Sequence, residues 1–324
     1  MFFMVFFKDK TIHGRKYRYL TKSIRLPDGR VKTIQKHVKD KNLSVAEAFK
    51  KHSDYFVAKE KEFNGDYALE RYNSDAVFTK AHLVRIECIK VDYQHTVKNF
   101  SREQYRDVFD RFIANFTYES NAIEGNSLTL KDVSIVMFED KSIEGKDLRE
   151  IYETKNSRKV MNLMLKNKFR INEKDIIGMY RILMKDIDSR TGYKKYPNYI
   201  VGSRVKLTSP EDVEEEMEEL IKWYEKTSGY ANPLKVAALF HGRFQRIHPF
   251  ADGNGRVGRF LANTILMQNK YPPLIIRKSQ RRSYIKSLED FHRGYTTNLE
   301  RFFLDKYKKT YNKFFKVYLK YVNK

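Results

Sequence analysis

Twelve consecutive residues, His248 to Arg259, gather the side chains of this 324-residue chain that are best suited to chemistry. Apolar residues recur at helical spacing before and after this segment, so it joins two helices. The turn Gly253-Asn254-Gly255 can adopt positive φ angles and direct successive N–H groups into one concavity. Because a helix N-terminus is partially positive, this turn is predicted to bind an anion.

The charged side chains of the segment indicate which anion. Arg256 and Arg259 are three residues apart, so they share one helix face and can reach the same group. His248 can serve as a base and Asp252 as a metal ligand. The pattern therefore favours a polyphosphate site. A dinucleotide-binding glycine motif is excluded, because a helix rather than a strand precedes the glycines.

The segment resembles the signature of the Fic family, His-x-Phe-x-Asp/Glu-Gly-Asn-Gly-Arg-x-x-Arg, at every specified position. Fic enzymes move AMP from ATP onto protein hydroxyls. The resemblance implies a mainly α fold, a helical bundle with a small β-hairpin flap, with ATP as substrate, Mg²⁺ as cofactor and a Ser, Thr or Tyr hydroxyl as acceptor. The acceptor would belong to a target protein or to the chain itself. Relatives use other donors, so the donor stays open.

By the same resemblance, His248 is the catalytic base and Asp252 the metal ligand. The phosphates of the nucleotide would be bound by five residues of the turn and the following helix: Gly253, Asn254, Gly255, Arg256 and Arg259.

The stretch Ser120–Asn126 reads Ser-Asn-Ala-Ile-Glu-Gly-Asn. By itself it is a helix end with a glycine cap. It also resembles the inhibitory motif of Fic proteins whose inhibitory helix, here about residues 101–126, precedes the catalytic domain. In the family the motif's glutamate pairs with the second signature arginine, so Glu124 is expected to pair with Arg259 and inhibit transfer. A second hypothesis is removal of AMP, with Glu124 placing a water molecule.

A flap and a nucleotide contact are assigned less directly. Tyr196–Leu207 reads as two short strands, where the family has a hairpin that pairs with the target's backbone; an ordinary surface hairpin would look the same. The contacting residues would be Tyr199, Ile200 and Val201. Tyr284 resembles a family residue near the adenine, although helix packing also explains it. His241, seven residues before His248, is expected to be packed, because no third metal ligand is spaced nearby.

Composition sets the remaining bounds. A single cysteine, Cys88, excludes a disulfide framework and fits a reducing compartment. Met1–Phe7 is apolar but too short to span a bilayer, so we expect a cytoplasmic protein without a membrane segment. The net charge of +23 suggests a polyanionic partner, or simply strong solvation.

The N-terminal fifty residues carry thirteen Lys or Arg against four acids. Alternating runs at Lys16–Ile24 and Arg30–Val38 predict a β-hairpin, with Met1–Phe7 as a third strand. Basic residues interleaved with Tyr17 and Tyr19 suit a nucleic-acid face. The alternative function is therefore a nucleic-acid-binding regulator with a nucleotide-sensing Fic core; a solvated structural hairpin is the other explanation.

The expected organisation has four parts. A basic β-rich extension covers residues 1–42, a helical connector 43–98, the Fic catalytic domain 99–295 and an aromatic helix 296–324. In the connector, Ser44 opens a helix expected to end at Asn64-Gly65-Asp66, and an irregular stretch follows through Tyr93. The aromatic helix is expected to supply core or a homo-oligomer surface.

Overall fold

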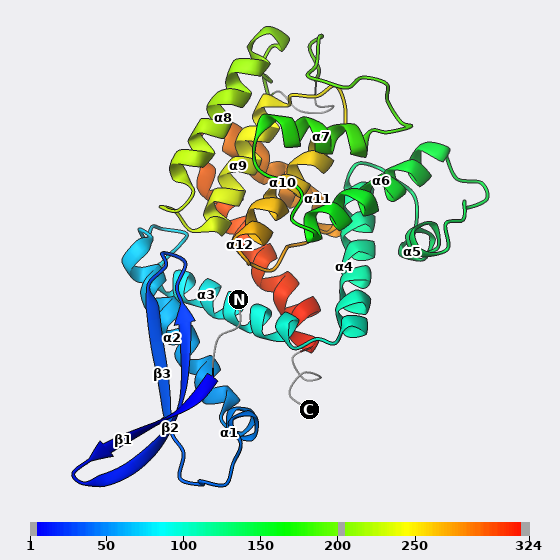
Figure 1. Ribbon diagram of the computed structural model, residues 1–324. Helices are drawn as coiled ribbons and strands as arrows, with labels where there is room; N and C mark the ends of the chain where they lie inside the picture. The colour runs from blue at the N-terminus through cyan, green and yellow to red at the C-terminus, as the bar shows by residue number, and fades with distance from the viewer. Residues whose placement is uncertain (1–4, 200–204, 319–324) are drawn as a thin grey trace. The chain divides into compact units, whose positions relative to one another are not determined.

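The computed structural model describes residues 5–199 and 205–318 (Figure 1). It is 62% helical and has one small antiparallel sheet near the N-terminus, so the mainly α fold class is confirmed. The chain divides into two compact units, Met1–His95 and Thr96–Lys324.

The sheet of the first unit has three strands in the order β1-β2-β3. They are β1 (Val5–Ile12), β2 (Arg15–Arg25) and β3 (Val31–His37). Between β1 and β2, His13 and Gly14 both have positive φ, 48° and 74°, as a two-residue turn of the hairpin type requires. The hairpin predicted from the sequence is present as β2 and β3. The strand predicted at Met1–Phe7 overlaps β1, which continues to Ile12; Met1–Met4 lie outside the described residues.

Three helices complete the first unit: α1 (Val45–Lys51), α2 (Ser53–Arg71) and α3 (Lys80–Lys98). Ser44 forms the predicted capping box with Glu47. The prediction that a helix ends at Asn64-Gly65-Asp66 is wrong, because α2 runs through it. A Cβ at Gly65 would lie 3.3 Å from Val84 Cγ1 of α3, so this glycine allows two helices to approach closely.

Of the stretch before Tyr93, residues 72–79 are irregular as predicted, whereas the chain from Lys80 onward is helical, so the irregular segment is shorter than predicted. Thr79 Oγ1 accepts a hydrogen bond from His82 N–H at 3.3 Å near the start of α3. Ile86 and Ile89 are buried. Burial of such β-branched residues compensates for their modest helix propensity.

The second unit is built from nine α-helices among its described residues. They are α4 (Arg102–Ile123), α5 (Leu130–Phe138), α6 (Leu148–Leu165), α7 (Glu173–Leu183), α8 (Val213–Thr227), α9 (Pro233–Ile247), α10 (Asn254–Gln268), α11 (Arg281–His292) and α12 (Thr296–Thr310). Side-chain oxygens of Ser101, Thr129 and Asn172 cap α4, α5 and α7, as their types and positions predict.

Helices α9 and α10 form the centre of this unit. Helix α9 contacts α8, α11 and α12, whereas α10 contacts α4, α6 and α7 (Figure 1). The turn between α9 and α10, which holds the signature, is therefore surrounded by helices on both sides. Such packing can hold its side chains in fixed positions.

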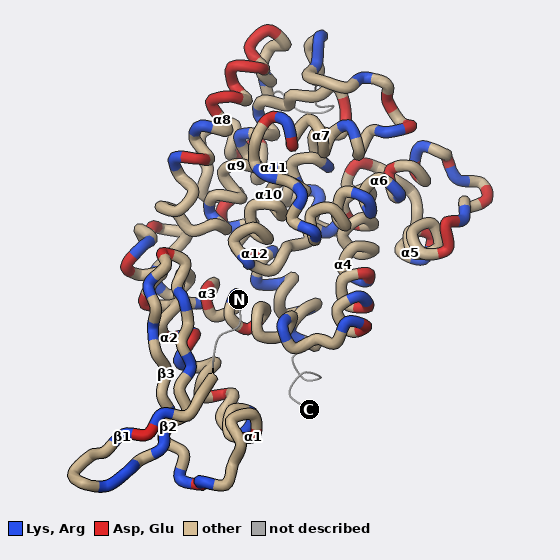
Figure 2. Tube along the Cα trace, viewed as in Figure 1, with Lys and Arg blue, Asp and Glu red and all other residues tan. Residues whose placement is uncertain are grey.

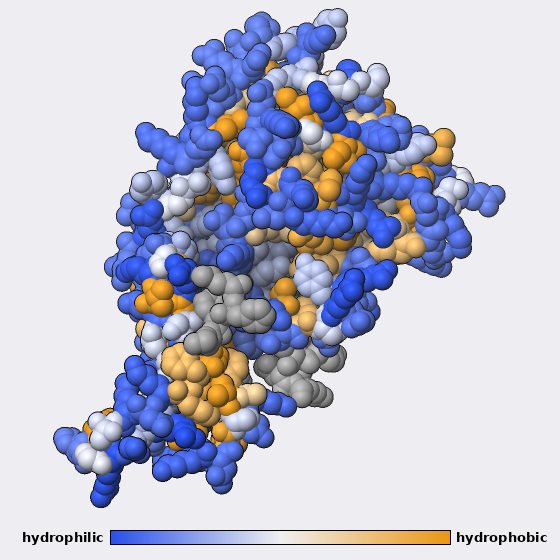
Figure 3. Space-filling model, in the orientation of Figure 1, coloured by the Kyte–Doolittle hydropathy of each residue, from blue (hydrophilic) through white to orange (hydrophobic). Residues whose placement is uncertain are grey.

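The aromatic stripe near the C-terminus is core. Leu299, Phe303, Tyr307, Tyr311 and Phe315 are all buried. Val322, which extends the same pattern, lies outside the described residues. Hydrophilic residues predominate on the face shown in Figure 3. In the described parts of the chain, we find no helix with the length and apolarity that a membrane span needs.

Candidate active site

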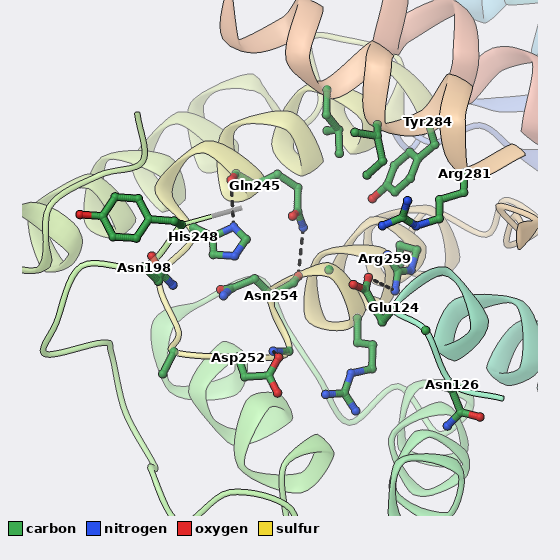
Figure 4. A pocket seen from close by; sticks show the side chains of 18 of the residues that line it. Glu124, Asn126, Asn198, Gln245, His248, Asp252, Asn254, Arg259, Arg281 and Tyr284 are labelled. Atoms are coloured by element: carbon green, nitrogen blue, oxygen red, sulfur yellow. Dashed lines mark hydrogen bonds and ion pairs between the residues drawn. The ribbon is translucent and has the colours of Figure 1, made fainter. Parts of the chain in front are cut away.

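A cavity of about 530 Å³ opens in the second unit and is shown in Figure 4. Ten residues that the sequence singled out line it: Glu124, Tyr199, His248, Asp252, Gly253, Asn254, Gly255, Arg256, Arg259 and Tyr284. They come from α4, the segment before α8, the α9–α10 turn, α10 and α11. Residues far apart in the chain therefore share one chamber.

His248 follows the last residue of α9 and adopts a left-handed conformation, with φ of 52°. Its N–H caps the helix by donating to the carbonyl oxygen of Phe244 at 2.9 Å. Its ring Nδ1 lies 3.3 Å from the carbonyl oxygen of Gln245. A carbonyl can only accept, so Nδ1 carries the proton and Nε2 keeps a free lone pair.

The charge state of His248 suits a base. Burial lowers the pKa of His248 to about 4, with the nearby Lys194 ammonium acting in the same direction. The imidazole is therefore neutral at pH 7 and can accept a proton at Nε2. Lys194 donates to Asn198 Oδ1 at 2.8 Å.

The loop after His248 is fixed from within. The Phe250 ring is fully buried and stacks on Tyr180, with centroids 3.9 Å apart. Asn254 Oδ1 accepts from Phe250 N–H at 2.9 Å, and Asn254 Nδ2 donates to Phe250 O at 2.7 Å. The side chain of Asn254 thus closes the loop, which leaves its main-chain N–H as the group suited to an anion.

The start of α10 has the geometry expected of an anion-binding turn. Gly253 has φ of 75° and occupies the N-cap position, a conformation that glycine adopts without strain. The N–H groups of the next residues have no partner inside the helix and carry the positive end of its dipole. A Cβ on Gly255 would lie 2.1 Å from Glu124 Oε1. The Glu124 carboxylate therefore lies directly against this turn.

Arg259 is held by the end of α4 and the residue after it. Its side chain is 3% exposed, and its Nη2 lies 2.7 Å from Glu124 Oε1. It also donates from Nη2 to Ser120 O at 2.8 Å and from Nε to Ser120 Oγ at 2.9 Å. The expected Glu124–Arg259 pair is present, and the first and fifth residues of the motif bind the same guanidinium.

Arg256 points toward a second acid. It is 2% exposed, with Nη1 3.3 Å from Glu153 Oε1 and Nη2 3.3 Å from Met184 Sδ. Its Nε, also buried, has no hydrogen-bond partner within the part of the chain that the structure describes. Glu153 accepts from Asn126 Nδ2 at 2.8 Å and from Arg149 Nε at 3.3 Å. Two arginines thus share one buried carboxylate.

Asp252 lies at the mouth of the cavity, where its side chain is 40% exposed. It accepts from Gly253 N–H at 2.6 Å and from Arg149 Nη2. Partial burial opposes ionisation, but Arg256, the Gly253 N–H and Arg149 outweigh it and hold the pKa of Asp252 below its ordinary value. This residue therefore presents a carboxylate.

The residues around Asp252 suit a magnesium ion that is also bound by the phosphates of a nucleotide. Throughout 5–199 and 205–318, no three or more His, Cys, Asp or Glu side chains are grouped so as to hold a metal. Magnesium is commonly bound by one or two carboxylates together with phosphate oxygens and water. Asp252, partly exposed beside the anion-binding turn, is suited to that arrangement.

Tyr284 lies on α11, near Arg281 and Arg259 (Figure 4). It is 1% exposed, and its hydroxyl is 2.7 Å from His241 Nε2. His241 is completely buried, as expected for a packed histidine, and burial lowers the pKa of His241 to about 3. Tyr284 lines the cavity. Its contact with the adenine of the nucleotide stays a prediction.

The predicted flap is only partly described. Tyr199 lines the cavity with an 85% exposed side chain. Ile200 and Val201 lie outside the described residues, and neither residues 196–199 nor 205–207 are in a strand. The target-binding role of these residues therefore stays a prediction.

Sequence reasoning missed Arg149 and Glu153. They lie four residues apart on α6, and such pairs also occur on ordinary solvated helix surfaces. No signal in the sequence singles them out, because the burial of Glu153 arises only when the helices pack. Both line the cavity.

A helical fold with a base beside the exposed N–H groups of a helix start is an arrangement suited to a phosphorylated ligand. Comparison places it further. Residues 170–266 match the Fic/DOC family profile. The chain is 35% identical to "Protein adenylyltransferase Fic" of Drosophila virilis over 198 residues, covering 60% of this chain and 41% of that protein. The chain thus spans less than half the length of these relatives.

Comparison with solved structures also finds Fic proteins. A Fic-domain-containing signaling protein from Bacteroides thetaiotaomicron is 25% identical, with a TM-score of 0.64 over 73% of this chain and 97% of that one. Fic-1 from C. elegans, 22% identical, shares the fold, with a TM-score of 0.63 over 82% of this chain and 76% of its own. Residues 170–266 thus form a Fic/DOC-family domain, and the fold around them is that of solved Fic proteins.

Proposed function

We propose that this protein transfers AMP from ATP to Ser, Thr or Tyr hydroxyls of proteins, including its own. One observation carries the proposal: neutral His248 faces the same cavity as the start of α10 and the buried Arg256 and Arg259. A base beside a polyphosphate-binding surface is what nucleotidyl transfer needs. The curated relatives named protein adenylyltransferase support the same reaction.

The transfer step uses the free Nε2 of His248. The target hydroxyl oxygen attacks the α-phosphorus of ATP while its proton passes to Nε2. A new phosphorus–oxygen bond forms, and the bond from the α-phosphorus to the oxygen bridging the β-phosphorus breaks. Pyrophosphate leaves with that oxygen and the bonding electrons. His248 then returns its proton to solvent.

The negative charge of the leaving pyrophosphate is stabilised by groups at the α10 end of the cavity. The N–H groups at the start of α10 bind phosphate oxygens, and Arg256 and Arg259 bind the β- and γ-phosphates. Both guanidiniums are already desolvated, so little reorganisation accompanies the reaction. Asp252 would hold Mg²⁺ with the phosphates, and the ion would help to neutralise the departing pyrophosphate.

Glu124 is the proposed inhibitor. Its carboxylate lies 2.7 Å from Arg259 and against Gly255, which is where an anionic γ-phosphate would be attracted. Because one guanidinium cannot serve both partners fully, bound ATP is misaligned while Glu124 stays in place. Displacement of the Glu124 side chain, which is 41% exposed, would release the enzyme.

The same carboxylate supports the removal of AMP. Glu124 reaches into the cavity from the side of α4 and could take a proton from water as it attacks the phosphorus of AMP-modified protein. The protein hydroxyl would then leave with a proton from His248. Removal therefore requires a protonated His248, whereas transfer requires the neutral ring that burial favours.

The test measures incorporation of label from α-labelled ATP with Mg²⁺. Four proteins are compared: wild type, Glu124→Gly, His248→Ala and the double variant. We expect Glu124→Gly to incorporate more label than wild type, and His248→Ala in that background to reduce incorporation by about 10²–10⁴-fold. Equal incorporation by Glu124→Gly and the double variant would refute the role of His248 as the base. Parallel reactions with labelled UTP and GTP test the donor.

A further inference from the structure

The sheet of the first unit presents a face whose side chains are basic and aromatic. Side chains of directly paired strand residues lie on the same face of a sheet, and the register pairs Lys8 with Tyr19, Lys10 with Tyr17, and Tyr19 with His37. Arg15 is on the same face, two residues before Tyr17. We call this set (Lys8, Lys10, Arg15, Tyr17, Tyr19 and His37) the basic face.

The opposite face of the sheet carries the buried apolar residues of the strands and their one acidic residue. Leu20, Ile24 and Ile34 are buried there, and Lys22 pairs with Glu60 of α2 at 2.7 Å. Asp9, the one acid in the three described strands, alternates onto this side and lies 3.4 Å from Arg18. Within the strands as described, the side of the sheet with the basic face therefore has four cations, Lys8, Lys10, Arg15 and Arg25, and no carboxylate.

The rings of the basic face are held in place. The His37 ring centroid lies 5.5 Å from both Tyr17 and Tyr19, at interplanar angles of 62° and 50°. Lys10 Nζ lies 5.1 Å from the centre of the Tyr19 ring and donates to Gln35 Oε1 at 2.6 Å. With these partners the rings are not open platforms, which single-stranded nucleic acid would need for base stacking.

The shape of the sheet suits a duplex. Residues 11–16, which form the β1–β2 turn and its flanks, are all exposed, and the hairpin projects beyond α1 and α2 (Figure 1). Lysines and arginines follow it (Figure 2), and the surface toward its turn is largely hydrophilic, whereas a hydrophobic patch lies over the start of β1 (Figure 3). A two-stranded ribbon fits the major groove of B-DNA, about 12 Å wide, whereas the major groove of duplex RNA is too narrow for side chains to read.

We propose that the basic face binds duplex DNA, with the β1–β2 hairpin in the major groove and Lys8, Lys10 and Arg15 on backbone phosphates. This activity is separate from AMP transfer, because every residue assigned to transfer lies in the second unit. Binding to DNA phosphates would also explain the strong positive charge of the first fifty residues. Phosphate contacts supply affinity, and the polar rims of Tyr17, Tyr19 and His37 would face base edges.

The experiment uses the full chain and a fluorescein-labelled DNA duplex of about two helical turns, followed by fluorescence anisotropy between about 50 and 200 mM salt. The test variant is Lys8→Ala/Lys10→Ala/Arg15→Ala. The matched control, Lys166→Ala/Lys168→Ala/Lys185→Ala, removes the same charge from exposed positions of the second unit.

Each phosphate contact contributes about 0.9 to the slope of log affinity against log salt. Three contacts correspond to a slope of about 2.7, or about a 40-fold loss of affinity over that fourfold change in salt. We expect the test variant to lose this part of the slope and the control to keep it. Equal slopes for wild type and test variant, or equal losses in both variants, would overturn the proposal.

Two further arms keep the test decisive. If circular dichroism shows that the triple variant is unfolded, Arg15→Ala alone, at an exposed position beside the turn, has to lower the slope by about 0.9. Tighter binding to a single strand of the same length, or to vesicles of anionic phospholipid, would also contradict a duplex-binding face.

Discussion

Replacing Glu124 by Gln should strengthen ATP binding while leaving AMP binding unchanged. Gln keeps the size of the side chain but removes the charge that pairs with Arg259 at 2.7 Å. The guanidinium is then free for the γ-phosphate. AMP lacks the β- and γ-phosphates, so it gains nothing from that release.

The magnitude follows from the burial of the two partners. A hydrogen bond to a charged group contributes about 1.5–3 kcal/mol when buried, whereas an exposed ion pair contributes about 0–1 kcal/mol. Arg259 is 3% exposed and Glu124 is 41% exposed, so the pair falls between these limits, at about 1–2 kcal/mol. Since about 1.4 kcal/mol is tenfold in affinity, ATP should bind about 5–30-fold more tightly.

Isothermal titration calorimetry with ATP, ADP and AMP measures this effect, in a His248→Ala background that prevents turnover. The control is Glu150→Gln, which removes a negative charge from another residue lining the same cavity. If the control strengthens ATP binding as much, the effect is general electrostatics. If AMP and ATP gain equally in Glu124→Gln, competition between Glu124 and the γ-phosphate is the wrong explanation.

Three further predictions concern other parts of the site. Because the pKa of His248 is lowered to about 4 and only the neutral ring accepts a proton, kcat/KM for transfer should rise with pH through about 4 and stay flat from about pH 5 to 8; a tenfold rise between pH 6 and 7 would refute this. Arg149→Ala frees Asp252, so the Mg²⁺ concentration needed for half-maximal ATP binding should fall, by up to about fivefold for a half-exposed pair, and Asp252→Ala should abolish the Mg²⁺ dependence; titration of both variants by calorimetry decides. Phe250→Ala removes a fully buried ring stacked on Tyr180 and should lower the free energy of unfolding by about 3–5 kcal/mol in urea denaturation, and an unchanged midpoint would contradict the proposed anchoring of the loop.

The parts of the fold that local chemistry dictates could be predicted from the sequence. Glycines at the α9–α10 turn, and the capping side chains of Ser44 and Ser101, act through contacts within a few residues. The Glu124–Arg259 contact joins residues far apart, and only a family resemblance made it predictable.

The parts that depend on tertiary packing could not be predicted. Gly65 was taken for a helix end, because its close approach to Val84 is a contact between helices that the sequence does not display. Asn254 was assigned to the phosphates without a choice between its side chain and its main chain, and only the folded loop shows that the side chain is bonded to Phe250. Glu153 reads as a surface acid until α6 and α10 are packed together.

Mass spectrometry of the Glu124→Gly protein, after incubation with Mg²⁺ and each nucleoside triphosphate in turn, tests the central claim most directly. The account predicts that ATP adds the mass of AMP to Ser, Thr or Tyr residues of the protein. It also predicts that the Glu124→Gly/His248→Ala protein stays unmodified in the same reaction. A protein that is unmodified with ATP, or that gains a bare phosphate or another nucleotide instead of AMP, would contradict the assignment of this cavity to AMP transfer.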